Sequence, residues 1–544
     1  MRRFLFILLA VLSLVACRGR QAADLILHHA IIYTVDSGFS RAEAMAVKDG
    51  KILAVGTDRD IMGGYESGQV VDGQGKAVYP GWIDAHAHFL EYGESLSAVN
   101  LYGCSSWDEA VARVKKFADE HPGQPWITGG GWDQNKYPGK AFPDNKTLNA
   151  AVPDRPVMLT RVDGHAMIVN EKALSLAGIH VGDKVDGGVV EMKGTTLTGI
   201  LIDNAQGRMY RVVPRPKADD WVTMLGMAQQ RCFMQGLTMV TDCGLNRDEI
   251  GLVDSLQKAG KLKMRMYVMM RDNKENLDYF IPKGPYKTDR LYVKGVKAYA
   301  DGALGSRGAR LLQPYSDQPG WSGLLLNTPA HFDSLAALLA PTDFQLCTHA
   351  IGDSANRMVL QIYEKHLGGK NDKRWRIEHA QVVNEADFDL FGKASIVPSV
   401  QPTHATSDMY WAGERLGAER LKGGYAYKKL LGELGWLPLG TDFPVEDISP
   451  YKTFLAAVFR VDAKGYPSGG FQMEDALSRE EAIRGMTIWA ARGSCLEKEV
   501  GSLEVGKRAD FVILDRDLMS ISWEEVLATK VVGTYLGGER VYGR

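Results

Sequence analysis

Two histidines separated by one residue, His86 and His88, end an apolar run over residues 78–85. Alternate residues of a strand project from the same face, so two imidazoles in this arrangement can share one metal ion. The pattern alone is weak evidence, because a chain of this composition contains about 0.3 His-x-His pairs by chance. The specificity must come from other residues.

Three more candidate ligands also end short apolar runs. His349 ends residues 344–349, His379 ends residues 375–379 and Asp442 ends residues 437–442. Imidazole and carboxylate groups bind Zn²⁺, and Mn²⁺, Fe²⁺ or Co²⁺ accept the same nitrogen and oxygen donors. One such histidine alone would be interpreted as a hydrogen-bonded core residue. Their shared position at the ends of apolar runs predicts a centre for one or two divalent metal ions, with zinc preferred.

These runs belong to a series of eight, each followed by a helical stretch. They cover residues 78–88, 237–242, 263–270, 293–299, 344–349, 375–379, 395–400 and 437–442. Strands that alternate with helices predict a parallel (β/α)₈ TIM barrel, in which catalytic groups lie at the carboxyl ends of the strands. Such a barrel needs about 250 residues. The barrel domain, residues 81–499, exceeds that length mainly through an insertion over about residues 90–230, which we expect above the catalytic face.

The two ends of the chain share a different pattern. Residues 24–80 and 500–544 contain short apolar runs separated by turn signals such as Asp49-Gly50. These features predict short antiparallel strands. We expect both ends to combine in one small β-sandwich domain.

The net charge and the N-terminal segment bear on the partners and the cellular location of the protein. The formal net charge is −2, from 64 basic and 66 acidic residues, so no strong field favours nucleic acid or an anionic membrane surface, and the charge indicates no partner. Two arginines followed by an apolar stretch at residues 4–12 are typical of a secretory signal. Residues 14–17, Leu-Val-Ala-Cys, resemble the bacterial lipobox. Residues 1–17 are thus predicted to be a lipoprotein signal segment with lipidation at Cys17, although an ordinary signal peptide with an incidental Cys17 is the alternative.

A lipid on Cys17 would anchor the protein to a membrane of the bacterial cell envelope, facing the periplasm. Arg18, rather than aspartate, follows this cysteine. In bacterial lipoproteins, a residue other than aspartate at this position resembles the signal for sorting to the outer membrane. The oligomeric state is not indicated by the sequence.

Four further motifs carry a family resemblance. They are Val-Asp-Gly-His-Ala-Met-Ile-Val-Asn at 162–170, the segment 297–309 that begins Lys-Ala-Tyr-Ala-Asp-Gly, His-Ala-Ile-Gly-Asp at 349–353 and Gly-Thr-Asp-Phe-Pro at 440–444. With the strand-end residues, they make the chain resemble the amidohydrolase superfamily, in the family 3 subgroup similar to N-substituted formamide deformylase. The resemblance implies a barrel flanked by a β-sandwich, and hydrolysis of carbon–nitrogen bonds by a metal-activated hydroxide. The partner it implies is a small-molecule amide substrate.

The resemblance also implies roles for individual residues. By position, His86, His88 and Asp442 would hold one metal, His349 and His379 a second, and a carbamylated Lys297 would bridge them. Two alternatives remain open: Lys297 pairs with Asp301 as an ordinary cation, or Asp301 takes the bridging place.

Other residues would act on the substrate. Asp442 would move the proton to the departing amine, and His165 would act beside it on the carbonyl oxygen or the substrate tail. Arg307 and Arg310 could clamp a substrate carboxylate, and His404 is a further substrate contact. These residues define the catalytic and substrate-binding predictions.

Three functions are therefore considered. The first is a metal-dependent hydrolase of non-peptide amide, N-acyl or N-formyl amine bonds. The second is a mononuclear deaminase or cyclic amidohydrolase that acts on a heterocycle, with Lys297 unmodified. The third is a non-catalytic surface lipoprotein with a binding or regulatory role. The number of bound metal ions separates the first two.

Overall fold

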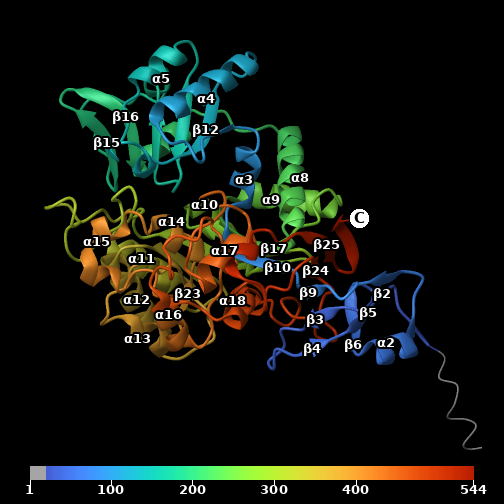
Figure 1. The fold of residues 1–544 in the computed structure, drawn as a ribbon. Helices are drawn as coiled ribbons and strands as arrows, with labels where there is room; N and C mark the ends of the chain where they lie inside the picture. The colour runs from blue at the N-terminus through green and yellow to red at the C-terminus, as the bar shows by residue number, and fades with distance from the viewer. Residues whose placement is uncertain (1–19, 544) are drawn as a thin grey trace, which may run out of the picture.

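The computed structural model describes residues 20–543. The predicted signal segment and the lipidation site at Cys17 lie outside this range. Within it, no helix combines the length and apolarity needed to cross a membrane. Figure 1 shows three parts: a central barrel, a lobe formed by the insertion, and strands from both chain ends beside one another.

The barrel predicted from the sequence is confirmed. Its parallel strands follow one another in chain order: β10 (Trp82–Ala87), β17 (Leu237–Leu245), β18 (Arg265–Arg271), β20 (Leu291–Tyr299), β21 (Gln345–Ala350), β22 (Arg376–His379) and β23 (Val397–Ser399). A short strand, β19 (Tyr286–Lys287), pairs antiparallel with β20. Ile83, Met239, Tyr267, Met269 and Cys347 pack together as an apolar cluster drawn from four of these strands.

Residues 437–442 close the barrel, although only a single bridge, between Val400 and Leu439, is formed there. The Gly440 amide donates to the carbonyl of Val400 on one side, and the Asp442 amide donates to the carbonyl of His86 on the other. Pro438 has no amide hydrogen and cannot donate to a ladder. The eighth segment is therefore shorter and less regular than the predicted strand, but it occupies the eighth position.

Helices cover the barrel and its loops. In chain order they are α3 (Phe89–Ser95), α8 (Ala218–Met234), α9 (Arg247–Lys258), α10 (Lys274–Phe280), α11 (Pro329–Leu339), α12 (Asp353–Leu367), α13 (Phe388–Lys393), α14 (Pro402–Asp408), α15 (Ala412–Leu421), α16 (Tyr427–Leu434), α17 (Pro450–Val458), α18 (Arg479–Gly485) and α19 (Ile488–Gly493). Local chemistry sets their ends. Asn246 and Glu249 form a capping box at the start of α9, and Gly368 ends α12 in the left-handed conformation, as expected for these residue types.

The insertion forms its own sheet, which the sequence did not predict. Its strands are β11 (Val99–Asn100), β12 (Ile127–Trp132), β13 (Val157–Arg161), β14 (Ala166–Val169), β15 (Gly188–Lys193) and β16 (Thr196–Asp203), in the order β11-β12-β13-β14-β16-β15. Helices α4 (Trp107–Glu120), α5 (Lys146–Ala151), α6 (Glu171–Leu176) and α7 (Gly207–Tyr210) accompany it. A separate core that includes Val114, Trp132 and Ile200 lies between α4 and this sheet, and Figure 1 shows the insertion as a distinct lobe.

Strands from both chain ends form two sheets. One has the order β6-β5-β2-β8 and the other β26-β25-β24-β9-β3-β4. Their bounds are β2 (Leu25–His28), β3 (Ile31–Tyr33), β4 (Arg41–Ala42), β5 (Ala44–Lys48), β6 (Lys51–Gly56), β8 (Val70–Asp72), β9 (Ala77–Pro80), β24 (Phe511–Leu514), β25 (Val531–Leu536) and β26 (Glu539–Gly543). A two-stranded ribbon of β1 (Gln21–Ala22) and β7 (Tyr65–Glu66) and helices α2 (Asp58–Gly64) and α20 (Trp523–Val526) complete this region.

The purely antiparallel pairing expected for these strands is wrong in two places besides the β1–β7 ribbon, which is also parallel. β2 pairs parallel with β8, and β3 pairs parallel with β9. Helix α2 and β7 lie between the members of each pair in the sequence, which provides the longer crossover that parallel strands require. β24 pairs antiparallel with β9, so the C-terminal segment completes a sheet that the N-terminal segment begins.

Candidate metal centre

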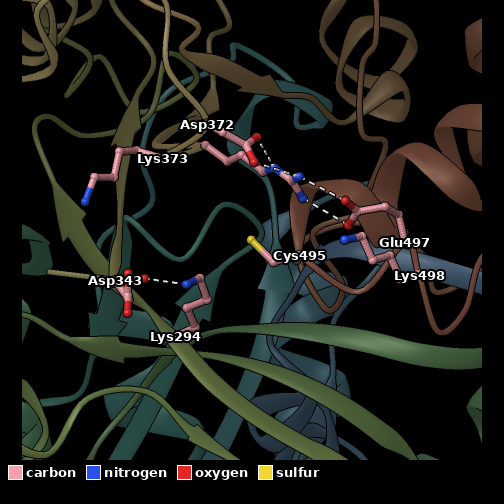
Figure 2. Close-up of a pocket in the computed structure, with 8 residues that line it drawn as sticks. Lys294, Asp343, Asp372, Lys373, Cys495, Glu497 and Lys498 are labelled. Carbon is pink, nitrogen blue, oxygen red and sulfur yellow. Dashed lines mark hydrogen bonds and ion pairs between the residues drawn. The ribbon is translucent and has the colours of Figure 1, made fainter.

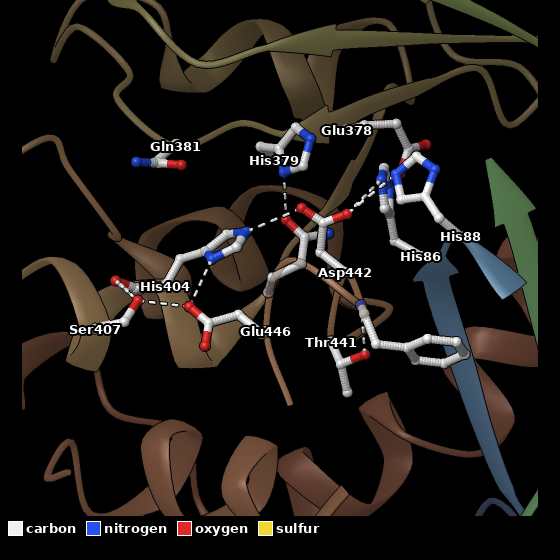
Figure 3. Close-up of polar contacts among 12 residues, drawn as sticks. His86, His88, Glu378, His379, Gln381, His404, Ser407, Thr441, Asp442 and Glu446 are labelled. Carbon is white, nitrogen blue, oxygen red and sulfur yellow. Dashed lines mark hydrogen bonds and ion pairs between the residues drawn. The ribbon is translucent and has the colours of Figure 1, made fainter. Parts of the chain in front are cut away.

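His86, His88 and Asp442 meet at the junction of the first and last barrel segments. His86 belongs to β10 and His88 follows it directly, where the chain turns into α3. The Nε2 atoms of His86 and His88 lie 3.4 and 3.3 Å from the same carboxylate oxygen, Oδ1 of Asp442. Figure 3 shows both rings directed toward this carboxylate. Three potential ligand atoms therefore converge on one small volume.

His379, His349 and Lys297 extend this cluster along neighbouring strands. The ring centroid of His379 lies 4.8 Å from that of His86 and 4.6 Å from that of His349. The Nζ atom of Lys297 is 3.4 Å from His86 Nε2 and 4.8 Å from the centre of the Tyr299 ring. All three side chains are buried. The structure thus brings together the six residues that the sequence predicted as metal ligands.

Two of these residues have strained backbones. Asp442 has a φ of 67° and His379 has a φ of 74°, in the left-handed region that non-glycine residues rarely occupy. Such conformations persist only when the surrounding structure enforces them, and they concentrate at functional sites. For Asp442, the hydrogen bond from its amide to the His86 carbonyl is one such constraint.

A hydrogen-bonded chain continues from Asp442 away from the imidazoles. Oδ2 of Asp442 lies 3.3 Å from Nε2 of His404, and Nδ1 of His404 lies 3.2 Å from Oε1 of Glu446. The hydroxyl of Ser407 donates to the same glutamate oxygen at 2.6 Å (Figure 3). Burial opposes a charge on His404, but the contacts with Asp442 and Glu446 outweigh it and raise the pKa of His404 to about 10. This imidazole is therefore cationic at neutral pH.

Residues behind the ligands fix the orientation of two imidazoles. Nδ1 of His86 contacts Oε2 of Glu378 at 2.5 Å, and Nδ1 of His379 contacts Oε1 of Gln401 at 2.7 Å. An acceptor at Nδ1 holds the proton on that nitrogen and leaves the Nε2 lone pair free for a metal. The sequence reasoning missed Glu378 and Gln401. A charged residue inside the apolar run that ends at His379 was the available signal for Glu378.

His165 comes to the cluster from the insertion. Its ring centroid lies 4.9 Å from that of His349, and its Nδ1 lies 2.7 Å from Oδ1 of Asp203. Burial opposes its charge, but Asp203 outweighs burial and raises the pKa of His165. Asp203 is buried and was not identified from the sequence. The insertion therefore contributes a side chain to the same site as the barrel.

Asp301 does not occupy the bridging place considered for it. Its carboxylate accepts the backbone amides of Ile351, Gly352 and Arg310 at 3.0, 2.8 and 2.7 Å. β20 ends at Tyr299, so Asp301 lies past the strand and holds two loops together. Oδ1 of Asp301 lies 3.7 Å from Nε2 of His349. Within residues 20–543, Lys297 Nζ contacts His86 and the Tyr299 ring and has no carboxylate at ion-pair distance, so the alternative pairing between Lys297 and Asp301 is absent.

The two arginines proposed as a substrate clamp are engaged elsewhere. Arg307 forms a two-bond contact with Asp317, at 3.2 Å from Nε and 2.8 Å from Nη2. Nη1 of Arg310 donates to the hydroxyl of Ser322 at 2.7 Å and to the carbonyl of Gly323 at 3.2 Å. These contacts join parts of one loop, and none of them involves the histidine cluster.

Three imidazoles of the cluster are held in the neutral form that a metal ligand requires. His88 differs, because burial opposes its charge but Glu91 and Asp442 outweigh burial and raise its pKa. Burial and the neighbouring Lys297 lower the pKa of His86 to about 4. Burial also holds the pKa values of His349 and His379 well below the usual range. Metal ligands must be neutral imidazoles and ionised carboxylates. Nε2 of His349 is buried and has no hydrogen-bond partner among the described residues, with Oδ1 of Asp301 at 3.7 Å, so its lone pair is available to a metal.

A cavity of about 300 Å³ lies elsewhere on the barrel. It is lined by Lys294, Asp343, Asp372, Lys373, Arg374, Cys495, Glu497 and Lys498 (Figure 2). Asp343 and Asp372 precede β21 and β22, whereas His349 and His379 stand near the ends of those strands. The cavity is thus at the opposite end of the barrel from the cluster, where TIM barrels do not place catalytic groups.

Comparison with known proteins agrees with this geometry. The sequence profile of the amidohydrolase family matches residues 69–542 of this chain. The chain belongs to the amidohydrolase family. The matched range includes all six clustered residues, from His86 to Asp442.

Individual relatives of this amidohydrolase cover nearly its whole length. It is 34% identical to the protein LONG AFTER FAR-RED 3 of Arabidopsis thaliana, over 96% of this chain and 92% of the relative. It is 27% identical to N-substituted formamide deformylase of Arthrobacter pascens, over 96% of this chain and 99% of the relative. Among solved structures, an uncharacterized metal-dependent hydrolase from Pyrococcus horikoshii OT3 superposes with a TM-score of 0.75 at 29% identity, over 92% of this chain and 99% of the other. These findings support a metal-dependent hydrolase.

Proposed function

We propose that this amidohydrolase cleaves carbon–nitrogen bonds of N-acyl or N-formyl amines. The observation that carries the proposal is the placement of Asp442, with Oδ1 between two ligand imidazoles and Oδ2 on His404. One carboxylate can then face both a metal and a proton carrier. The similarity to a relative named for deformylation of N-substituted formamides supports the same bond type.

His86, His88 and Asp442 would hold one divalent metal, for which their nitrogen and oxygen donors favour zinc. His349 and His379 would hold a second, and Lys297, if carbamylated, would supply an anionic bridge between the two. When bound, such a metal supplies a hydroxide nucleophile near neutral pH and polarises the scissile carbonyl.

The residues of the chain would then handle protons and orientation. Asp442 would accept the proton of the nucleophile and deliver it to the nitrogen of the leaving amine, because amine departure requires protonation. The cationic His404 would stabilise the ionised Asp442 through Oδ2. His165, oriented by Asp203, would donate a hydrogen bond to the carbonyl oxygen of the substrate.

A mononuclear deaminase or cyclic amidohydrolase is the second candidate. The observation that favours it is the distance of 3.4 Å between Lys297 Nζ and His86 Nε2, where an unmodified ammonium would disfavour a second cation. Counting bound metal ions per chain decides between them. A non-catalytic role is disfavoured, because all six predicted ligands lie together, and a binding protein needs no such set.

Metal removal tests the proposed chemistry. Prolonged chelation should abolish hydrolysis of a panel of N-formyl and N-acyl amines, and Zn²⁺ or Mn²⁺ should restore it. The Sγ atom of Cys243 lies within 4.8 Å of the ligand atoms of His86 and Glu378, but burial raises the pKa of this thiol well above its usual value, so the neutral thiol does not replace a metal-activated hydroxide. Release of the free amine provides the assay, and circular dichroism checks that the metal-free protein stays folded. Full activity in thoroughly demetallated protein would contradict the proposal.

A lipid anchor at Cys17 remains a separate proposal, supported by the lipobox-like residues 14–17. Cys17→Ser should yield a form that is unprocessed or released from membranes, because the lipidated thiol is missing. Cell fractionation and electrophoretic mobility measure the change. Identical fractionation and mobility of the variant and the wild type would rule the anchor out.

A further inference from the structure

The Nδ1 atoms of His86 and His379 hydrogen-bond to different kinds of acceptor. Behind His86 stands the carboxylate of Glu378, 2.5 Å from Nδ1, whereas behind His379 stands the neutral side-chain amide of Gln401, 2.7 Å from Nδ1. Both contacts fix the tautomer that directs Nε2 into the cluster. Only the carboxylate adds a negative charge, which makes the imidazole a stronger donor to a cation.

Arg376 holds Glu378 in place through a buried ion pair. Its Nε lies 2.6 Å from Oε1 of Glu378, and its Nη2 lies 2.9 Å from Oε2. Nη2 also donates to the carbonyl of Ala85 and the hydroxyl of Ser399, both at 2.7 Å. The side chains of Arg376, Glu378 and His86 are completely buried, so water does not screen the charges in this row.

Arg376, Glu378 and His86 thus form a line of contacts that crosses the barrel interior, from β22 to the end of β10 that faces the metal site. Arg376 and Glu378 alternate on one strand with a single residue between them, so both side chains project from the same face. A buried ion pair of this kind gives little net stability compared with apolar residues. Its presence beneath a candidate ligand indicates a role in metal binding instead.

We propose that Glu378, held by Arg376, is a positioning residue that sets the metal affinity of the site formed by His86, His88 and Asp442. The carboxylate makes this site the tighter of the two, and the site supported by Gln401 the weaker. The proposal rests on the proposed metal centre. The difference between Glu378 and Gln401 then decides which of the two sites has the higher metal affinity, and the site with the higher affinity fills first.

Glu378→Gln isolates the charge. The substituted amide keeps an oxygen that can accept from His86 Nδ1, so His86 then resembles His379 in its support. We expect the affinity of the tighter site for Zn²⁺ to fall by about 10- to 100-fold, the usual effect of losing such a partner. Titration of the metal-free full-length chain with Zn²⁺ alone, against a competing chelator, measures the affinity without any assay of activity.

Glu497→Gln is the matched control. Glu497 accepts two bonds from Arg374, at 2.9 and 3.0 Å, beside the cavity of Figure 2. The control removes the same charge from an arginine–glutamate pair in the same barrel, but at the end far from the histidines. Its Zn²⁺ affinity should equal that of the wild type.

Loss of the carboxylate leaves Arg376 as an unpaired buried charge, which could unfold the variant. The double variant Arg376→Met/Glu378→Gln removes both charges, and circular dichroism in chelator reports whether each variant folds. A folded single or double variant with weakened Zn²⁺ binding supports the proposal. A folded variant that binds Zn²⁺ as tightly as the wild type overturns it. Failure of the wild type itself to bind Zn²⁺ would instead overturn the metal centre.

Discussion

The two carboxylate oxygens of Asp442 have different neighbours, and this difference separates its two tasks. Oδ1 lies between the Nε2 atoms of His86 and His88, and Oδ2 lies against His404. Burial opposes ionisation of Asp442, but His86, His404 and His88 outweigh it and hold the pKa well below its usual range. The residue is thus ionised in the metal-free site.

Asp442→Asn keeps an oxygen donor and the shape of the side chain but removes the base. We expect kcat to fall by at least roughly 100-fold, the usual scale for losing general acid–base assistance. Metal content, measured by atomic absorption, should fall much less than kcat. Asp447→Asn, at an exposed carboxylate paired with Lys452, is the control and should be close to wild type. A near-normal kcat with metal bound would move the proton transfer to another residue, with His404 and His165 the first candidates.

The loop between β20 and α11 supports a residue that it does not itself contain. Gly302 and Gly308 of this loop lie against Asp203, the carboxylate that orients His165. A β-carbon on Gly302 would stand 2.5 Å from Oδ2 of Asp203, and one on Gly308 would stand 2.6 Å from it. The absence of a side chain at Gly302 and Gly308 therefore leaves room for the carboxylate of Asp203, at the contact between the insertion and the barrel.

Gly308→Ala tests this junction. The added methyl should displace Asp203 and, with it, His165, lowering kcat/KM by roughly 10- to 100-fold, because small misplacements of catalytic groups are costly. Steady-state kinetics on the metal-loaded protein measure the loss. Gly251→Ala on α9, where a β-carbon meets nothing within 4 Å, should leave kcat/KM unchanged. Equal kinetics for both variants would show that His165 does not depend on this packing.

At the scale of the whole molecule, a buried ion pair joins the barrel to the strands from the chain ends. Nε of Arg265, on β18, lies 3.1 Å from Oδ2 of Asp510, just before β24. Oδ1 of Asp510 accepts the amide of Gly537 at 2.6 Å. Both side chains are over nine-tenths buried, so each depends on the other for charge compensation.

Asp510→Ala should lower the free energy of unfolding by about 3 kcal/mol, because the buried guanidinium of Arg265 loses the carboxylate that compensates its charge. Denaturant titration followed by circular dichroism measures the change. Glu539→Ala breaks an exposed pair with Lys263 and should cost less than about 1 kcal/mol. A loss for Asp510→Ala no larger than that of the control would mean that the two parts are held together mainly by apolar packing.

The sequence by itself determined the barrel and the residues that could do chemistry at its edge. His349, His379 and Asp442 could be recognised because each follows an apolar run, and parallel strands bring their carboxyl ends to one edge whatever their separation in the chain. His86 and His88 needed only the two-residue period of a strand. Local pattern and one topological rule were sufficient for these predictions.

Only the tertiary structure decided what stands behind and beside those residues. Glu378 contacts His86 across 292 positions of sequence, and Asp203 contacts His165 across 38. The sheet of the insertion and the irregular closing segment at residues 437–442 were equally hidden. Such contacts depend on the register between strands and on how separately folded layers meet. These are set by packing over the whole molecule, and no local periodicity encodes them.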